Sequence, residues 1–393
     1  MPPALGNVSL PAWADELAPD GGIPTPQRFI GAGGGWRHVD WLSVMAWYLH
    51  SLAERAHEER NGPIHSYAGG LRGWDARLWD RAWVNRIALF LRRWSERLHP
   101  GICGPLPEAE VCLTHDLDAI GITYAIRCKQ TAFQLLNACR SACSCDGRRL
   151  RDRLASARRF AFVRNGRDGL CETITLERSL GLRSRIHVYG GRGGWLRSPL
   201  DLVLDPGYNL AHDHALARRL RCLQGDGWRI GIHPSFRAWS SAKRIAAEMR
   251  RITETTGIDV DCSRNHWLRF SFGASWRLLG EAGIQEDSTL GFNDRPGFRC
   301  GAALRFQPLD LATGRPGPLR VLPLILMDSQ LYDYSDMCPE ARRASMARWL
   351  DEVSAVRGQA AVLWHPHTLG RAYGWDDGFR QLLPMVARMR TLV

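Results

Sequence analysis

Short apolar segments alternate with helical patterns about seven times between residue 110 and the C-terminal end of the sequence. Because strands that alternate with helices are joined by crossover connections, this pattern predicts an α/β fold with a parallel sheet, and the strand count favours a barrel-like closure. The strand-like segments are residues 111–118, 184–189, 228–233, 259–263, 285–291, 321–327 and 360–364, and the main helical segments are 120–142, 212–223, 240–255, 275–282 and 339–356.

Polar residues follow four of these strand-like segments at the point where each segment ends. In parallel α/β barrels the chemistry collects at the carboxyl ends of the strands, so we expect these side chains to share one site. The residues concerned are Asp116 and Asp118, His233, Arg264 and His266, and His365.

These residue types are suited to metal-assisted hydrolysis. One carboxylate and two imidazoles suit Zn²⁺, and Co²⁺, Ni²⁺ or Mn²⁺ remain alternatives. A metal ion lowers the pKa of water and polarises a carbonyl group, a second carboxylate can accept the proton of the water, and a histidine can protonate a leaving amine. The set therefore contains the parts needed to hydrolyse an amide.

The order of the motifs over residues 108–370 resembles the polysaccharide deacetylases of the NodB-homology type, carbohydrate esterase family 4. The closest likeness is to a divergent branch that carries Thr-His-Asp-x-Asp. The four segments that carry the resemblance are Thr114-His115-Asp116-Leu117-Asp118, His233-Pro234-Ser235-Phe236-Arg237, Arg264-Asn265-His266-Trp267 and Leu363-Trp364-His365. The resemblance implies a distorted (β/α)7-type barrel and metal-dependent removal of an acetyl group.

The resemblance also implies roles in the first motif. Asp116 matches the catalytic base and Asp118 the metal ligand. The family usually has adjacent aspartates, whereas Leu117 separates them here, so an exchange of the two roles stays open.

The second and third motifs supply the other implied ligands. His233 matches the first histidine of the second motif, and Arg237 stands where that motif has its second histidine. We expect His266 to be the replacement ligand, with a structural role as the alternative. Arg264 then orients the base, and Arg269 is the alternative partner.

The final motif implies His365 as the general acid, with His367 as the alternative. Trp267, Arg299 and His115 are predicted substrate contacts, and a surface ion pair is the alternative for Arg299. Asp287 fits either a residue that orients the acid or a strand-end cap, and His212 and His214 are expected to be solvated.

The N-terminal region has a different pattern. Residues 1–30 are rich in proline and are predicted to be irregular, and helices are predicted over 39–59 and 82–98. Prolines and glycines between 100 and 107 mark a domain boundary. We therefore predict an N-terminal helical accessory region at 1–105 and a catalytic barrel at 106–393, with a helical insertion at about 130–170.

Composition limits the class of partner. The formal charge is +12, but it comes almost entirely from arginines scattered along the chain, and their clearest concentration, Arg148 to Arg167, lacks the interleaved aromatic residues of a single-strand binding surface, so no nucleic-acid partner is expected. An odd number of cysteines, eleven, argues against a secreted disulfide scaffold. No signal-peptide pattern or membrane-spanning apolar run is present, and a cytoplasmic location is expected.

The sequence thus predicts a metal-dependent carbohydrate N-deacetylase that acts on an N-acetylated sugar, nucleotide sugar or glycan. Hydrolysis of another C–N bond, as in a cyclic amide or formamide, and a degenerate protein that binds a glycan or partner are the alternatives. The sequence does not identify the sugar or the oligomeric state.

Overall fold

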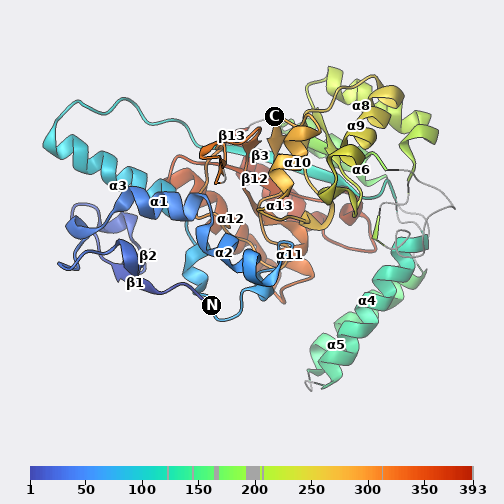
Figure 1. Cartoon of the computed structure of the whole chain (residues 1–393). Coiled ribbons are helices and arrows are strands. Elements are labelled where there is room, and N and C mark those ends of the chain that lie inside the picture. Colours follow the sequence, from blue (N-terminus) through green and yellow to red (C-terminus); the bar gives the residue numbers. More distant parts are fainter. Residues whose placement is uncertain are drawn as a thin grey trace. The chain divides into compact units, whose positions relative to one another are not determined.

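The computed structural model describes residues 1–121, 124–143, 146–162, 168–191, 204–205, 208–311 and 313–391 (Figure 1). The chain divides into two compact units. Unit 1 consists of Met1–Cys112, Trp267–Val362 and Arg388–Leu392, and unit 2 is formed chiefly by Leu113–His266 and Leu363–Ala387. The domain boundary predicted near residue 105 stays a prediction.

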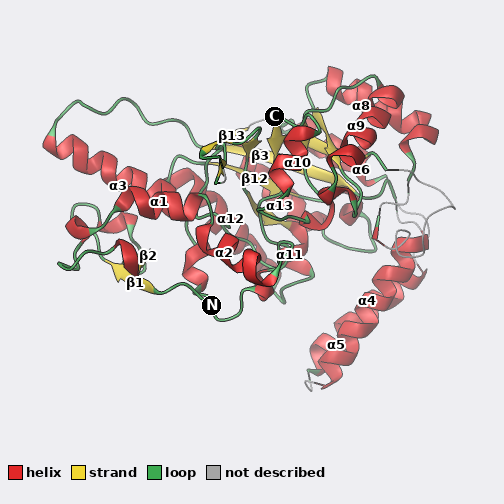
Figure 2. Cartoon of the chain, in the orientation of Figure 1, coloured by secondary structure: helices red, strands yellow, loops and turns green. Residues whose placement is uncertain are grey.

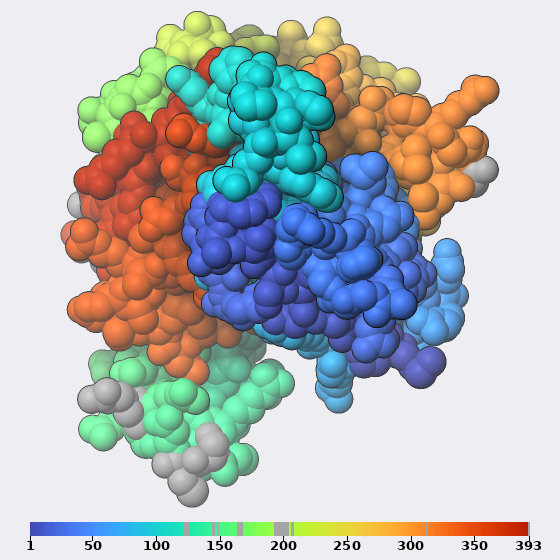
Figure 3. All heavy atoms as spheres, turned by 90° about the vertical axis from the view of Figure 1, so that its left-hand side faces the viewer, coloured from blue at the N-terminus to red at the C-terminus, as the bar shows by residue number. Residues whose placement is uncertain are grey.

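The N-terminal part of unit 1 contains three helices, α1 (Trp41–Leu49), α2 (Leu52–Asn61) and α3 (Trp83–Leu98). Asp40 begins α1 by accepting a hydrogen bond from the Ser43 backbone N–H at 3.1 Å. The single helix predicted over 39–59 is two helices, because Ser51 adopts a left-handed backbone with φ of 50°. The segments drawn in blue lie together in the space-filling view (Figure 3).

The prediction that residues 1–30 are irregular was wrong, because strands β1 (Leu5–Val8) and β2 (Ile23–Pro26) pair antiparallel there. The other strands of unit 1 are short. They are β7 (Glu286–Asp287), β8 (Leu309–Asp310), β9 (Arg315–Pro316), β10 (Arg320–Val321), β11 (Leu324–Met327) and β13 (Arg390–Thr391), and the later helices are α10 (Ser275–Glu281), α11 (Asp328–Tyr332) and α12 (Pro339–Ala355).

The predicted strand over 321–327 is divided into β10 and β11. Pro323 lies in the interruption, where a residue without a backbone N–H cannot continue a ladder as a donor. Strand β12 (Gln359–Leu363) matches the last predicted strand and contributes its final residue to unit 2.

Unit 2 contains three long stretches of sheet, β3 (Glu110–Leu117), β4 (Arg185–Tyr189) and β5 (Arg229–His233), and the short β6 (Cys262–Ser263). All residues of β3 and β4 are buried, as expected for parallel strands covered on both faces. Its helices are α4 (Tyr124–Cys143), α5 (Gly147–Phe162), α6 (Gly169–Ser179), α8 (His214–Gly225), α9 (Ala242–Thr256) and α13 (Asp376–Ala387).

The main sheet has the strand order β10-β7-β6-β5-β4-β3-β12-β11, and β13 pairs with β3. Figure 2 shows strands of this sheet in yellow, among them β3, β12 and β13. The pairs β3–β4, β4–β5 and β5–β6 are parallel. A curled parallel sheet alternating with helices confirms the predicted α/β fold of the distorted barrel type.

Register aligns particular residues across unit 2. Asp116 on β3 pairs with His187 on β4, and His187 pairs with Gly231 on β5. Two residues further along, Tyr189 pairs with His233. Since side chains alternate between the faces of a strand, these residues occupy one face of the sheet, in the middle or at the carboxyl end of their strands.

Helices α4 and α5 pack side by side as a hairpin (Figure 1). They cover much of the range predicted as a helical insertion, of which residues 144–145 and 163–167 lie outside the described residues. Among the described helices, none is long and apolar enough to cross a membrane.

Candidate metal centre

The two aspartates of the first motif lie on one face of the sheet. Asp116 is in β3 and Asp118 follows its end, so the single residue between them, Leu117, points its side chain to the opposite face. The Asp116 side chain is buried, whereas the Asp118 side chain keeps 25% of its surface exposed. The spacing therefore brings two carboxylates to one site and gives them different environments.

Asp116 is held by two nitrogen donors. Arg264 Nη1 donates to Asp116 Oδ1 at 3.2 Å, and His187 Nδ1 lies 3.0 Å from the same oxygen. Burial raises the pKa of the Asp116 carboxyl, but Arg264 and the nearby imidazoles lower the pKa by more, so it lies well below its usual value. Asp116 is therefore a carboxylate at neutral pH.

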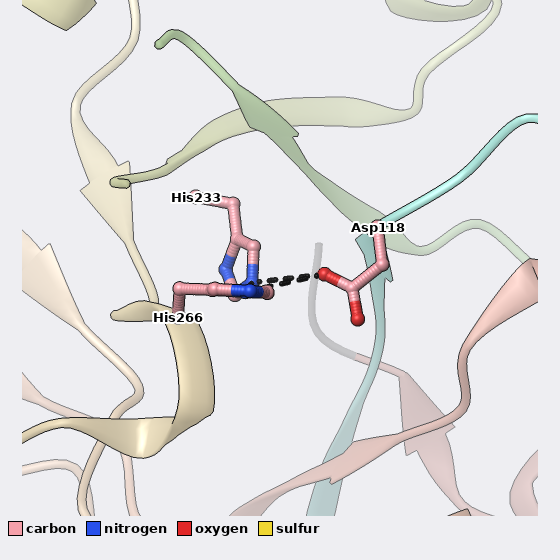
Figure 4. A group of neighbouring side chains, drawn as sticks. All are labelled: Asp118, His233 and His266. Atoms are coloured by element: carbon pink, nitrogen blue, oxygen red, sulfur yellow. Dashed lines mark hydrogen bonds and ion pairs between the residues drawn. The ribbon is translucent and has the colours of Figure 1, made fainter. Parts of the chain in front are cut away.

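Asp118, His233 and His266 form a compact cluster of possible ligands, in which all three ligand atoms lie within 4.8 Å of one another (Figure 4). Asp118 Oδ1 is 3.3 Å from both His233 Nε2 and His266 Nδ1, and the two ring nitrogens are 2.6 Å apart. Figure 4 shows the three side chains pointing toward one another.

The outer nitrogens of both imidazoles are occupied by backbone carbonyls. His233 Nδ1 donates to the Arg264 carbonyl at 2.7 Å, and His266 Nε2 donates to the Leu204 carbonyl at 2.6 Å. These bonds fix the tautomers, so that both inner nitrogens present lone pairs to the cluster. Metal-binding histidines are commonly oriented in this way.

The cluster fits a divalent ion. Ligands about 2.0–2.1 Å from a tetrahedral zinc ion lie roughly 3.3 Å apart, which matches the two distances from Asp118. The two facing lone pairs at 2.6 Å need a proton or a cation between them. Burial raises the pKa of Asp118, but His266, His233 and His365 lower the pKa by more, so the carboxylate is ionised.

His365 lies on the exposed side of the same cluster. Its Nε2 is 3.6 Å from Asp118 Oδ2, and its side chain is 15% exposed. The His365 and His367 rings have centroids 5.5 Å apart, and His367 packs its ring against Tyr373. His365 therefore contacts the cluster through Asp118.

His115 lies on the opposite face of β3 from Asp116. Its ring is fully buried, with Nε2 2.6 Å from Glu177 Oε1 and Nδ1 2.6 Å from the Trp364 carbonyl. Glu177 also accepts hydrogen bonds from Ser184 and Trp228. This is a satisfied buried network, and the predicted substrate contact of His115 stays a prediction.

The other predicted substrate contacts belong to unit 1. Trp267 directly follows His266, is half-buried and has a left-handed backbone with φ of 56°. Arg299 is buried, where its guanidinium binds Glu54 and donates to Ser66 Oγ at 2.6 Å. The ion pair weighed for Arg299 is present in a buried form, and both substrate-contact roles stay predictions.

Two alternatives also have partners within unit 1. The Asp287 carboxylate accepts hydrogen bonds from Trp276 and Thr289. Arg269 Nη2 is 3.0 Å from His65 Nε2, while Arg264 is the arginine that contacts Asp116. His212 and His214 are exposed, as predicted.

The sequence did not identify His187 or Leu204, and it gave no role to Thr114 of the first motif. The hydroxyl of Thr114 accepts from Arg264 Nη1 at 2.7 Å. A signal for His187 existed, because Arg185 and His187 are polar residues at alternate positions of a strand otherwise made of apolar residues. The Leu204 carbonyl has no signal in the sequence, since any residue supplies that group.

No protein-family model matches the chain, and no curated protein matches it. Among solved structures, the chain is similar to a candidate polysaccharide deacetylase from Mycobacterium smegmatis, with 17% identity, a TM-score of 0.41, and coverage of 74% of this chain and 89% of that chain. A polysaccharide deacetylase from Bacillus cereus has 10% identity, a TM-score of 0.34, and coverage of 72% and 87%.

A family 4 carbohydrate esterase from Streptomyces lividans, in complex with acetate, has 9% identity, a TM-score of 0.31, and coverage of 56% and 81%. At identities and TM-scores this low, the likeness assigns no function to this chain.

Proposed function

We propose that this protein is a metal-dependent carbohydrate N-deacetylase. The observation that supports it best is the cluster of Asp118, His233 and His266, with inner ring nitrogens fixed as lone-pair donors, next to a second carboxylate held by an arginine. Zn²⁺ is the proposed ion, and Co²⁺, Ni²⁺ and Mn²⁺ are the alternatives. When bound, such an ion supplies Lewis acidity that lowers the pKa of water and polarises an acetyl carbonyl.

The proposed base is Asp116. It is ionised and accepts from two donors on Oδ1, so Oδ2 is the oxygen that takes the proton of the attacking water. Arg264 orients this carboxylate and keeps it ionised.

The proposed acid is His365. Its place beside the more exposed oxygen of Asp118 suits a group that meets substrate, and its partial exposure leaves room for a sugar. As water attacks the acetyl carbon and the C–N bond breaks, His365 donates a proton to the departing amine. The products are acetate and a free amino sugar.

The test is release of acetate by the purified, metal-loaded chain from monomeric, nucleotide-linked and polymeric N-acetylated sugars. Acetate release with wild type and none with Asp118→Asn supports the proposal. If none of these substrates releases acetate and a cyclic amide or formamide is hydrolysed instead, the result would support hydrolysis of another C–N bond. Metal binding without turnover of either class would favour a glycan-binding protein.

The cytoplasmic location stays a proposal for cell fractionation to test.

A further inference from the structure

His187 is a buried histidine that neither the motifs nor the proposed chemistry uses. It lies in the middle of β4, its side chain has no exposed surface, and its Nδ1 is 3.0 Å from Asp116 Oδ1. The two residues are direct partners in the β3–β4 register. The contact is therefore set by the sheet itself and not by a surface loop.

The sheet also leaves room for this ring. Gly231 is the partner of His187 on β5, and a Cβ atom at Gly231 would lie 2.8 Å from His187 Cδ2 and 2.7 Å from Cys262 Sγ. The imidazole thus occupies the space that any other residue at position 231 would fill. The His187 side chain is therefore confined by its partners on both adjacent strands, Asp116 on β3 and Gly231 on β5.

The ring is a neutral donor. Burial lowers the pKa of His187 to about 3, against a smaller opposite effect of Asp116. A neutral imidazole that faces a carboxylate through Nδ1 must carry its proton there. Its Nε2 has no hydrogen-bond partner among the described residues.

The two donors converge on one oxygen of Asp116. His187 and Arg264 both reach Oδ1, whereas Oδ2 accepts no hydrogen bond from the part of the chain that the structure describes. The nearest nitrogen recorded at Oδ2, His233 Nδ1, is 3.8 Å away and donates instead to the Arg264 carbonyl. One oxygen is held, and the other is left for a proton.

We propose that His187 is a positioning residue that, together with Arg264, fixes the Asp116 carboxylate so that Oδ2 faces the water. This inference rests on the proposed function, because it needs Asp116 to act as the base. Arg264 supplies a positive charge next to the carboxylate. His187 orients the carboxylate through a neutral hydrogen bond and adds no second positive charge beside the proposed metal ligands.

The kinetic test compares His187→Ala with His187→Asn in the metal-loaded chain. Loss of the donor should lower kcat about 10- to 100-fold with KM and metal stoichiometry unchanged, because a base displaced by a fraction of an ångström loses alignment. Asparagine places an amide N–H near the former Nδ1 and should restore most of the loss. His212→Asn, at an exposed position, is the control and should leave kcat unchanged.

Equal losses in His187→Ala and His187→Asn, or an unchanged kcat in His187→Ala, would overturn the positioning role. A readout that needs no turnover separates this from failure of the proposed function. In ¹⁵N spectra of the imidazoles, His187 should carry its proton on Nδ1, and the Nδ1 resonance should move in Asp116→Asn. A proton on Nε2, or no response to Asp116→Asn, would overturn the proposal even if the chain proved to be a deacetylase.

Discussion

At the scale of single residues, the spacing of the two aspartates places their carboxylates in different surroundings. Leu117 places Asp116 and Asp118 on one face of the sheet, one against Arg264 and one against the two imidazoles. Asp118 is the carboxylate within the cluster of possible ligands, and the assignment of the two roles stays a prediction.

This assignment predicts opposite behaviour of the two asparagine variants. Asp116→Asn should lower kcat by about 10²- to 10⁴-fold while the metal content stays near that of wild type, because a base is lost and the ligands remain. Asp118→Asn should lower the metal content itself. Metal analysis and acetate release on the same preparations check both, and loss of metal in Asp116→Asn alone would reverse the assignment.

The replacement of a motif histidine by His266 was predicted from residue types, and the structure brings His266 beside His233. His187 was not predicted, because its alternation with Arg185 marks one face of a strand but does not say which residue of another strand it meets when the register is unknown. Register depends on pairing between segments far apart in the chain, which local patterns do not specify.

The low pKa of His187 predicts a particular dependence of stability on pH. Its pKa is about 3 in the folded chain and about 6.5 when unfolded, so the unfolded chain binds the proton first as pH falls. The contribution of the neutral ring is full above pH 6.5 and is lost progressively toward pH 3. Between pH 7 and pH 4.5 the free energy of unfolding of wild type should fall relative to His187→Asn by about 2–3 kcal/mol.

Denaturant unfolding of both proteins at the two pH values measures this difference. A gap between wild type and variant that stays constant across this range would mean that His187 binds its proton with the same pKa in the folded and unfolded protein.

At the scale of elements, the register of β3, β4 and β5 aligns Asp116, His187 and Gly231 across the sheet. The sequence predicted these strands and the placement of polar residues at their ends. It did not predict that β6 and β7 would be only two residues long, because irregular backbone next to a strand shares its apolar composition.

Gly231 is therefore a position where a methyl group should be costly. A Cβ there would lie 2.7 Å from the Cys262 carbonyl oxygen, which belongs to the backbone and cannot rotate away. Gly231→Ala should lower the free energy of unfolding by about 1–3 kcal/mol or more. Gly225→Ala is the matched control, since nothing lies within 4 Å of its Cβ at the end of α8, and it should be neutral or slightly stabilising.

Residues 204, 205 and 208 form a second supporting element around the cluster. The Leu204 carbonyl accepts from His266, Asp205 accepts from the Phe236 backbone N–H at 2.6 Å, and the Tyr208 hydroxyl accepts from the Tyr189 N–H at 2.6 Å. The first of these contacts orients His266, a proposed ligand, through a residue that no motif identified.

Asp205→Ala should therefore weaken metal affinity about 10-fold or more, because the carbonyl that orients His266 is no longer anchored. Asp213→Ala, which removes the N-cap of α8, is the control and should lower stability without changing the metal Kd. Titration with Zn²⁺ or Co²⁺ measures both. Equal affinities in wild type and Asp205→Ala would show that His266 keeps its orientation without this anchor.

At the scale of the whole molecule, each compact unit is built from separate stretches of the chain. Strand β3 has residues in both, and all the residues assigned to the metal cluster, base and acid belong to unit 2. The sequence located the N-terminal helices and the alternating C-terminal part. It could not show that Trp267–Val362 forms a unit with the N-terminal residues, since that depends on contacts between distant segments.

A resident metal ion should stabilise the folded chain by mass action. An ion present at 100 times its Kd adds about 2.7 kcal/mol when it binds only the folded state. Chelation should lower the Tm of wild type and of Asp116→Asn, whereas Asp118→Asn should respond little. Thermal unfolding with and without added Zn²⁺ measures the effect. If neither the metal nor the chelator changes the Tm of wild type, the result would contradict a metal site.

The contact between Asp116 and Arg264 spans 148 residues of sequence. A ribosome that adds about 5–20 residues each second needs roughly 7–30 s to make the arginine after the aspartate. For that interval Asp116, in a strand that is fully buried in the finished fold, lacks the arginine that it pairs with there. We therefore expect β3 to pack into the sheet of the nascent chain only after the third motif has left the ribosome. The synthesis of Arg264 would then limit when this part of the fold can form.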